Sequence, residues 1–475
     1  MTQRQISVVV LGGGPGGYEA ALVAAALGGS VTVVDRDGVG GAAVLTDCVP
    51  SKALISTAAY VGHVEEARDM GVHLAPEVER RTTDSAALVA DMAEINDRVV
   101  ALAGAQSRDI QNRLEQVGVR VIKGTGTLLD SSTVEARTSD GQVETLNAEM
   151  ILLATGATPR VLPTAQPDGE RILTWKQIFN LREVPRKMIV VGSGVTGAEL
   201  AQAFLGLGAH VVLVSSRDRV LPGEDPDAAQ LIEDVFRRRG MEVLNRSRAS
   251  AVERTEDGVV VTLEDGRTIE GSHALIAVGS IPATDNLGLE QAGVELSPSG
   301  HIVVDRVSRT TARGVYAAGD CTGVLPLASV AATQGRIAVA HALGDAVAPL
   351  QVRGVSANIF TDPEIATVGT AQQGGDQPEG VHTVMMPFAT NARAKMDNLT
   401  DGFVKLHARN GSGVLVGGVV VAPRASELIF PIALAVQQRL TVDQVASTIT
   451  VYPSLSGSIA EAARRMHVID DEPSA

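Results

Sequence analysis

Cysteine is nearly absent from this chain of 475 residues, which contains only Cys48 and Cys321. Two thiols are too few for the disulfide framework of a secreted protein. No secretory signal precedes Ile6–Leu11, an apolar stretch that runs directly into a cluster of glycines. We therefore expect a cytoplasmic protein.

Excess positive charge, long apolar runs and metal-binding patterns are also missing. The chain has 40 Lys and Arg residues against 55 Asp and Glu residues, a net charge of -15 that disfavours binding to a nucleic-acid backbone. Apolar runs such as Ala20–Leu27 and Val414–Val421 fall well below the ~18 residues that a membrane span requires. The nine histidines show no metal-ligand spacing. We expect no nucleic-acid partner, no integral membrane segment and no metal site.

The first positive signal is a glycine cluster between two apolar segments. The β-branched run Val8–Leu11 leads into the glycines and then into the alanine-rich Tyr18–Leu27, which predicts a strand, a tight turn and a helix. A second strand, Ser30–Val34, follows and ends at an acidic residue. In a dinucleotide-binding unit the three spaced glycines permit the turn, the approach of a pyrophosphate and the packing of helix on strand. The candidate cofactor-binding residues of this unit are Gly12, Gly14, Gly17 and Asp35.

The same arrangement recurs later in the chain. A strand at Met188–Val191, a glycine cluster, a helix expected from Ala198 and a strand at His210–Val214 repeat the first unit. Asp35 lies 23 residues after Gly12, and Ser215 lies 23 residues after Gly192. One such motif is a weak signal, but two with equal spacing predict two nucleotide domains. The candidate residues of the second unit are Gly192, Gly194, Gly197 and Ser215.

Two further segments resemble each other and predict how the domains connect. Ile151–Pro159 and Leu275–Pro282 are both apolar strands closed by Gly-x-x-Pro. They predict the points where the chain leaves the first nucleotide domain and returns to it, so the second domain is inserted in the first. Candidate cofactor-binding residues at these strand ends are Thr155, Gly156 and Gly279.

The last quarter of the chain has a different character. A hairpin is predicted from two strands, 402–407 and Val414–Val421, joined by a turn near Asn410 and Gly411. A helix is predicted over Ala425–Leu440. The predicted fold class is α/β, with two Rossmann-like nucleotide-binding domains and an α+β C-terminal domain. The expected boundaries are 1–159 and 283–352 for the first nucleotide domain, 160–282 for the inserted domain and 353–475 for the C-terminal domain.

The segment Gly40–Lys52 carries a resemblance to a known family. It resembles the active-site stretch of the flavoprotein disulfide reductases, Gly-Gly-x-Cys, four residues, then Cys-x-Pro-Ser-Lys. Cys48 stands at the second cysteine, but Ala43 stands at the first. Near the C-terminus, Tyr452 replaces the histidine of the family's His-Pro-Thr-x-x-Glu segment and Gly457 replaces its glutamate. The dithiol and its proton carrier are both missing, so we expect no disulfide reductase activity.

The resemblance extends over almost the whole chain and implies FAD, a nicotinamide nucleotide and a homodimer. It implies that Lys52 lies beside the flavin and pairs with Glu199, and these two are the candidate catalytic residues. An ammonium there would favour the anionic reduced flavin. The resemblance also implies that Asp320 binds the ribityl chain and that Gly41 belongs to the FAD site.

Nicotinamide selectivity can be read in part from the end of the second unit. Ser215 stands where an acid would bind the ribose 2'-hydroxyl and repel a 2'-phosphate. Arg217 and Arg219 follow closely, although the arginines of NADPH-specific relatives would fall at Ser216 and Pro222. We expect NADPH to be used and NADH also to be accepted.

Without a dithiol, the flavin is the remaining redox centre, and its acceptor must be diffusible. Within the family, the chain resembles lipoamide-dehydrogenase-like NAD(P)H quinone reductases, which share Ala43 and the ending Tyr452–Gly457. This resemblance implies an FAD-dependent NAD(P)H:quinone oxidoreductase. Two alternatives remain open: a soluble pyridine nucleotide transhydrogenase, and a non-catalytic interaction protein that keeps FAD as a structural core.

Overall fold

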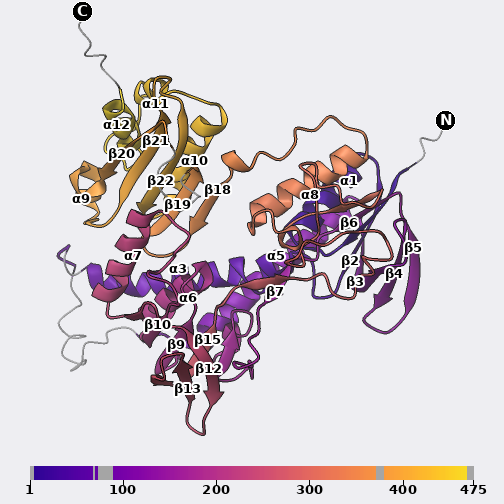
Figure 1. Cartoon of the computed structure of the whole chain (residues 1–475), viewed down its shortest axis with the longest axis horizontal. Coiled ribbons are helices and arrows are strands. Elements are labelled where there is room, and N and C mark those ends of the chain that lie inside the picture. Colours follow the sequence, from indigo (N-terminus) through magenta and orange to yellow (C-terminus); the bar gives the residue numbers. More distant parts are fainter. Residues whose placement is uncertain (1–4, 68–69, 73–88, 371–378, 468–475) are drawn as a thin grey trace, which may run out of the picture.

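The computed structural model describes residues 5–67, 70–72, 89–370 and 379–467. These residues form two parallel-based sheets, an antiparallel C-terminal sheet and two smaller antiparallel sheets. In Figure 1 the first sheet lies near the N-terminus, the second lies towards the bottom of the view, and the C-terminal sheet lies at the upper left in orange to yellow. The long helices α3 (Cys48–Glu66) and α5 (Met92–Gln116) run between these regions.

At the centre of the first sheet, β1 and β6 are short strands whose side chains are almost all buried. The order of this sheet is β17-β6-β1-β2-β3-β4-β5, parallel up to β3 and antiparallel beyond it. Helices α1 and α8 pack side by side (Figure 1), so closely that a Cβ on Gly335 would lie 2.1 Å from the carbonyl oxygen of Gly16. The elements are β1 (Ser7–Leu11), α1 (Pro15–Ala26), β2 (Ser30–Asp35), α2 (Gly41–Leu45), β3 (Arg120–Leu128), β4 (Thr133–Thr138), β5 (Val143–Asn147), β6 (Met150–Leu153), β17 (Val315–Ala317), η2 (Asp320–Thr322) and α8 (Ala328–Ala342).

The second sheet has the order β11-β10-β9-β15-β8 and is parallel throughout. A three-stranded antiparallel sheet, β12-β13-β14, packs beside it. The elements are β8 (Ile172–Thr174), η1 (Ile178–Asn180), β9 (Lys187–Val191), α6 (Val195–Gly206), β10 (His210–Val214), α7 (Pro226–Arg238), β11 (Glu242–Leu244), β12 (Ala249–Arg254), β13 (Val259–Leu263), β14 (Thr268–Gly271) and β15 (His273–Ile276).

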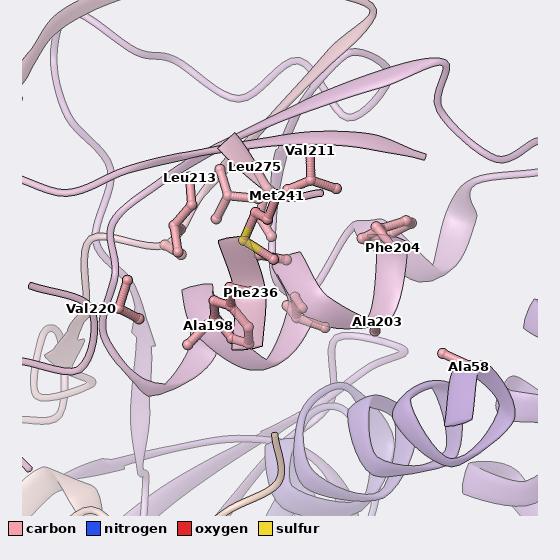
Figure 2. Packing of buried hydrophobic residues seen from close by; sticks show 14 of the residues in the cluster. Ala58, Ala198, Ala203, Phe204, Val211, Leu213, Val220, Phe236, Met241 and Leu275 are labelled. Atoms are coloured by element: carbon pink, nitrogen blue, oxygen red, sulfur yellow. The ribbon is translucent and has the colours of Figure 1, made fainter. Parts of the chain in front are cut away.

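The core of this region joins the second sheet to α3. In Figure 2, Phe236 of α7 lies close to Met241 and Leu275, whereas Phe204 of α6 lies apart from them, on the side where Ala58 of α3 approaches the end of α6. Phe204 and Phe236 are fully buried. This contact brings the helix that carries Lys52 against the helix that carries Glu199.

The expected start of α6 at Ala198 is wrong by three residues, because the helix begins at Val195. Gly194 is the N-cap residue, and its extended backbone (φ −72°, ψ −173°) lets the first turn form directly after the glycine loop. The helix expected over Ala425–Leu440 ends at Gln437. Both differences are three residues, and helix ends are the part of a helix that a sequence pattern locates least precisely.

The chain enters and leaves the second region side by side. Strands β7 (Ala157–Pro159) and β16 (Ser280–Pro282) pair antiparallel, and β17 then returns to the first sheet beside β6. The predicted fold class, with one nucleotide unit inserted in the other, is therefore confirmed. The domain boundaries at residues 159, 282 and 352 stay predictions.

The C-terminal sheet has the order β18-β19-β22-β21-β20 with antiparallel neighbours. The predicted hairpin is the pair β21 and β22, and α10 packs against β19 and β22. The elements are η3 (Val352–Gly354), β18 (Ser356–Ile359), β19 (Glu364–Gly369), β20 (Val381–Pro387), η5 (Phe388–Thr390), α9 (Ala392–Met396), β21 (Phe403–Arg409), β22 (Leu415–Ala422), α10 (Ala425–Gln437), α11 (Val442–Ala446) and α12 (Gly457–Arg465). Across the described ranges, no helix combines the length and apolarity needed to cross a bilayer.

Candidate functional site

The first glycine loop connects β1 to α1 through main-chain contacts that leave no room for side chains. Gly12 has φ +101°, and a Cβ there would lie 2.2 Å from the carbonyl oxygen of Ala154. A Cβ on Gly17 would lie 1.8 Å from the carbonyl oxygen of Gly12. Helix α1 has no side-chain cap at its N-terminus, and the positive end of its dipole favours an anion there.

Asp35 holds this loop from the end of β2. Its Oδ2 accepts the N–H of Gly13 at 2.6 Å, and its Oδ1 accepts those of Asp37 and Gly38 at 2.9 and 2.6 Å. The carboxylate is only partly buried. It therefore orders the loop and still presents charge at the expected place of a ribose.

The second glycine loop repeats this geometry between β9 and α6. Gly192 has φ +110°, and a Cβ there would lie 2.3 Å from the carbonyl oxygen of Ala277. A Cβ on Gly197 would lie 1.9 Å from the carbonyl oxygen of Gly192, whereas the space beside Gly194 is open. Helix α6 also lacks a side-chain cap, so its N-terminus offers a second anion-binding position.

Ser215 does not present its hydroxyl to solvent at the end of β10. The residue is 0% exposed, and its Oγ lies 2.7 Å from Oγ of Ser193 and accepts the N–H of Arg217 at 3.2 Å. Arg217 is exposed, and it makes no ion pair with any residue that the structure describes. At this strand end the hydroxyl of Ser215 is therefore buried, and the cationic side chain of Arg217 is accessible to solvent.

The candidates Gly41 and Asp320, together with Thr46, which the sequence did not indicate, test whether FAD fits beside the first loop. Gly41, with φ +56°, approaches Gly14 so closely that a Cβ on Gly41 would lie 2.7 Å from Cα of Gly14. Thr46 Oγ1 is buried and finds no hydrogen-bond partner within the described part of the chain, so a bound polar group could satisfy it. Asp320 lies in η2, where burial raises its pKa. A narrow glycine cradle, an unsatisfied hydroxyl and a carboxyl group suit a large polar cofactor such as FAD.

The strand-end candidates differ in their surroundings. Thr155 follows β6 and its Oγ1 is buried. Gly156 and Gly279 have φ of +70° and +97°, and the space where their Cβ atoms would stand is open. Positive φ explains why glycine occupies both positions.

Lys52 and Glu199 form an ion pair between α3 and α6. Nζ of Lys52 lies 2.8 Å from Oε2 of Glu199, and their side chains are 27% and 3% exposed. Burial by itself would lower the pKa of Lys52, but the charge and hydrogen bond of Glu199 outweigh burial, so the pKa is raised. The ammonium is therefore charged at neutral pH.

Cys48, at the start of α3, lacks the properties of a reactive thiol. Burial, followed by the nearby Asp47, raises its pKa to about 11. Cys48 and Cys321 are both free, and Cys321 is fully buried. Tyr452, which replaces the expected histidine, is 85% exposed on the C-terminal region. A thiol with so high a pKa is a poor nucleophile at neutral pH.

Besides Thr46, two site residues escaped the sequence reasoning, Phe360 and Gln202. The main-chain N–H of Phe360 donates to Oε1 of Glu199 at 2.8 Å, and Gln202 bonds both the N–H and the carbonyl oxygen of Asp362 at 2.8 Å. These contacts join residues about 160 positions apart, so no local pattern could have indicated them. The structure groups no three metal-binding side chains within the ranges it describes.

Comparisons with known proteins agree with this geometry. Residues 6–335 match the pyridine nucleotide-disulphide oxidoreductase family model, and residues 355–463 match the dimerisation domain of that family. A protein of Mycobacterium tuberculosis strain H37Rv named NAD(P)H dehydrogenase (quinone) is 53% identical over 474 residues, covering 98% of this chain and 94% of the relative. A dihydrolipoyl dehydrogenase of Geobacillus stearothermophilus is 34% identical, covering 97% and 96%.

Solved structures show the same fold. The crystal structure of LpdA from Mycobacterium tuberculosis has a TM-score of 0.90 and 52% identity, with coverage of 98% of this chain and 100% of that one. The flavoprotein disulfide reductase RclA of Escherichia coli, at 23% identity and a TM-score of 0.84, shares the fold.

Proposed function

Because the chain belongs to the pyridine nucleotide-disulphide oxidoreductase family, we propose that it is an FAD-dependent NAD(P)H:quinone oxidoreductase that works without a redox disulfide. The observation that carries this proposal is the partly buried Lys52–Glu199 ion pair at 2.8 Å, next to a single thiol whose pKa is raised to about 11. A charged pair is present at the expected flavin edge, while the groups for disulfide chemistry are absent from the sequence. A non-catalytic flavin core would not require this pair.

The first glycine loop and its neighbours are proposed to hold FAD. The N-terminus of α1 would bind the pyrophosphate, Asp35 the ribose and Asp320 the ribityl chain. Gly14 and Gly41 leave the space that a side chain would fill. When bound, FAD supplies hydride acceptance from a nicotinamide and electron transfer to the acceptor.

Lys52 and Glu199 are proposed to set the charge at the flavin. Glu199 keeps Lys52 protonated despite burial, and the fixed ammonium favours electron uptake nearby.

The second glycine loop is proposed to bind the nicotinamide nucleotide. Its strand ends in a buried, neutral Ser215 and not in an acid, so nothing there repels a 2'-phosphate. The unpaired Arg217 attracts one. We therefore infer that NADPH is used and that NADH is also accepted.

A quinone is proposed as the acceptor, because the 53% identical relative carries that activity in its name and because a flavin without a dithiol must donate directly. The alanine at position 43 and the glycine at position 457 replace larger groups and leave space for a planar molecule. A cytoplasmic location remains a prediction from composition.

We also infer that the chain forms a homodimer through its C-terminal region. The match to the dimerisation domain supports this. Exposed apolar side chains there are Phe430 at 69%, Ile449 at 98%, Val451 at 78% and Tyr452 at 85%. Such a concentration suits burial against a second copy.

The test is anaerobic stopped-flow with the purified holoprotein. The bound flavin is first reduced with NADPH or NADH and then mixed with menadione, lipoamide or an oxidised nicotinamide. Rapid reoxidation by menadione and not by lipoamide supports the proposal. Reoxidation by oxidised nicotinamide alone would identify a transhydrogenase, and failure of both nucleotides to reduce the flavin would identify a non-catalytic protein.

A further inference from the structure

The segment Phe360–Asp362 of the C-terminal region is bound to the outer side of α6 through its main chain. Oε1 of Glu199 accepts the N–H of Phe360 at 2.8 Å. Gln202, three residues further along α6 and therefore on the same side of the helix, donates to the carbonyl oxygen of Asp362 and accepts its N–H, each at 2.8 Å. Three hydrogen bonds fix this segment against the helix of the nicotinamide region.

The ring of Phe360 lies over the ammonium group of Lys52. Nζ of Lys52 is 5.0 Å from the ring centroid, within the range of a cation–π interaction. Lys52 thus contacts Glu199 on one side and an aromatic face on another. Both contacts favour the charged form of the lysine, which burial opposes.

Glu199 has both oxygens engaged. One accepts from Lys52 and the other from the main chain of Phe360, and the side chain is only 3% exposed. A buried carboxylate with both oxygens bonded has little freedom to rotate. The direction of Glu199, and with it the place of the Lys52 ammonium, depends on Phe360.

We propose that Phe360 is a positioning residue for the flavin site: its N–H orients Glu199 and its ring holds the ammonium of Lys52. A residue of the C-terminal region then sets the charge at a site formed by the other two regions. This inference rests on the proposed function, since that function places Lys52 beside the flavin. It adds no chemical step, because Phe360 acts only through Lys52 and Glu199.

The test is the midpoint potential of the bound FAD in Phe360→Leu and Phe360→Tyr. The leucine keeps the main-chain N–H but removes the ring, so we expect a lower midpoint potential and flavin reduction by NADPH about three- to tenfold slower. The tyrosine keeps the ring and should behave as the wild type. Phe360→Met, which nearly preserves side-chain volume, is measured in parallel in case the leucine variant is unstable.

A second lysine provides the matched control. Nζ of Lys405 lies 5.4 Å from the ring centroid of Phe403, outside the candidate flavin site. Phe403→Leu also removes a cation–π contact, and it should leave the midpoint potential unchanged. An equal shift in Phe403→Leu would overturn the proposal, because it would show a general effect of core truncation.

The variant Lys52→Met shows whether Phe360 affects the flavin through Lys52 or only through packing. If Phe360 acts through Lys52, Phe360→Leu adds no further change in midpoint potential when Lys52 is already methionine. An undiminished shift in the double variant would overturn the proposal, as would a wild-type potential in both Phe360→Leu and Phe360→Met. Either of these two outcomes would defeat only the role of Phe360. The proposed function would stand as long as NADPH reduces the flavin of the wild-type protein normally. A wild-type flavin that NADPH cannot reduce defeats that function, whether or not the potential depends on Phe360.

Discussion

The two glycine loops have the same backbone geometry, but different residues surround them. In each loop the first glycine has φ above +100°, and a Cβ on the third would lie less than 2 Å from a carbonyl oxygen of the first. In the first loop, Asp35 bonds three main-chain amides and Gly41 approaches Gly14. In the second loop a buried serine pair replaces the acid, and Gly194 faces open space.

The comparison separates what a dinucleotide loop requires from what it can vary. The glycines are needed because the strand turns directly into the helix and the two main chains contact each other there. The residue at the end of the next strand and the covering segment are free to change. An enclosed, acidic first loop suits a resident cofactor, and an open, acid-free second loop suits a nucleotide that enters and leaves in each turnover.

The largest expected effect follows from adding one methyl group to each loop. Gly17→Ala forces a Cβ to within 1.8 Å of the Gly12 oxygen, so the protein should purify without FAD. Gly197→Ala makes the matching clash in the second loop and should retain FAD while the KM for NADPH rises at least about tenfold. Flavin absorbance and steady-state kinetics measure both.

The control is Gly62→Ala in α3, where the added methyl group meets no atom within 4 Å. It should leave FAD content and KM unchanged. The comparison would fail if Gly197→Ala lost FAD as completely as Gly17→Ala does, because the loops would then not serve separate ligands.

A buried ion pair holds the N-terminus of α7, the helix that comes after the second glycine loop and β10. Lys405, 7% exposed, bonds Asp225 at 2.7 Å and Asp227 at 2.5 Å, and Asp225 is the N-cap residue of α7. Lys405→Met leaves the buried Asp225 carboxylate without its cation and should lower the free energy of unfolding by about 3–5 kcal/mol. Urea unfolding of the holoprotein measures the change.

The exposed Arg246–Asp218 pair provides the control for that variant. Its side chains are 79% and 71% exposed, so Arg246→Gln should change stability little, as surface ion pairs do. Equal unfolding midpoints for Lys405→Met and the wild type would show that the ion pair between Lys405 and the N-terminus of α7 does not stabilise the protein.

A moderate effect is expected at the strand end of the second loop. Arg217→Gln removes an unpaired cation and should raise the KM for NADPH about tenfold, the equivalent of one charge-assisted hydrogen bond, with little change for NADH. Steady-state kinetics with both nucleotides measures the ratio. An equal loss with NADH would show that Arg217 contacts a part common to both nucleotides.

The smallest expected effect concerns the thiol beside the first loop. The pKa of Cys48 is raised to about 11, so the thiol stays protonated through neutral pH and ionises only as the pH nears that value. Cys48→Ser should leave turnover with menadione unchanged, and iodoacetamide should modify the wild type slowly at pH 7. If Cys48→Ser bound FAD but showed no turnover with menadione, the result would show that Cys48 takes part in the reaction.

Much of this comparison could be predicted from the sequence because it depends on short-range patterns. The equal 23-residue spacing predicted two nucleotide units, and the motif positions of Lys52 and Glu199 predicted a pair that the structure joins at 2.8 Å. Their role beside a flavin stays a prediction.

Contacts that depend on side-chain direction or on distant segments could not be predicted. The inward turn of Ser215 toward Ser193 depends on a rotamer, and a serine at that position is equally compatible with an exposed hydroxyl. The contact of Phe360 with Glu199 spans 161 positions and arises only when the C-terminal region packs on α6. The Lys405–Asp225 pair arises in the same way, from a strand and a helix that meet only in the folded chain.

An anaerobic reductive titration of the holoprotein distinguishes electron passage through the flavin alone from passage through a dithiol. Dithionite is added stepwise while flavin absorbance is followed. We expect complete reduction with two electrons per FAD, since Cys48 has no partner thiol at position 43. Uptake of four electrons per FAD would reveal a second redox group and contradict this expectation.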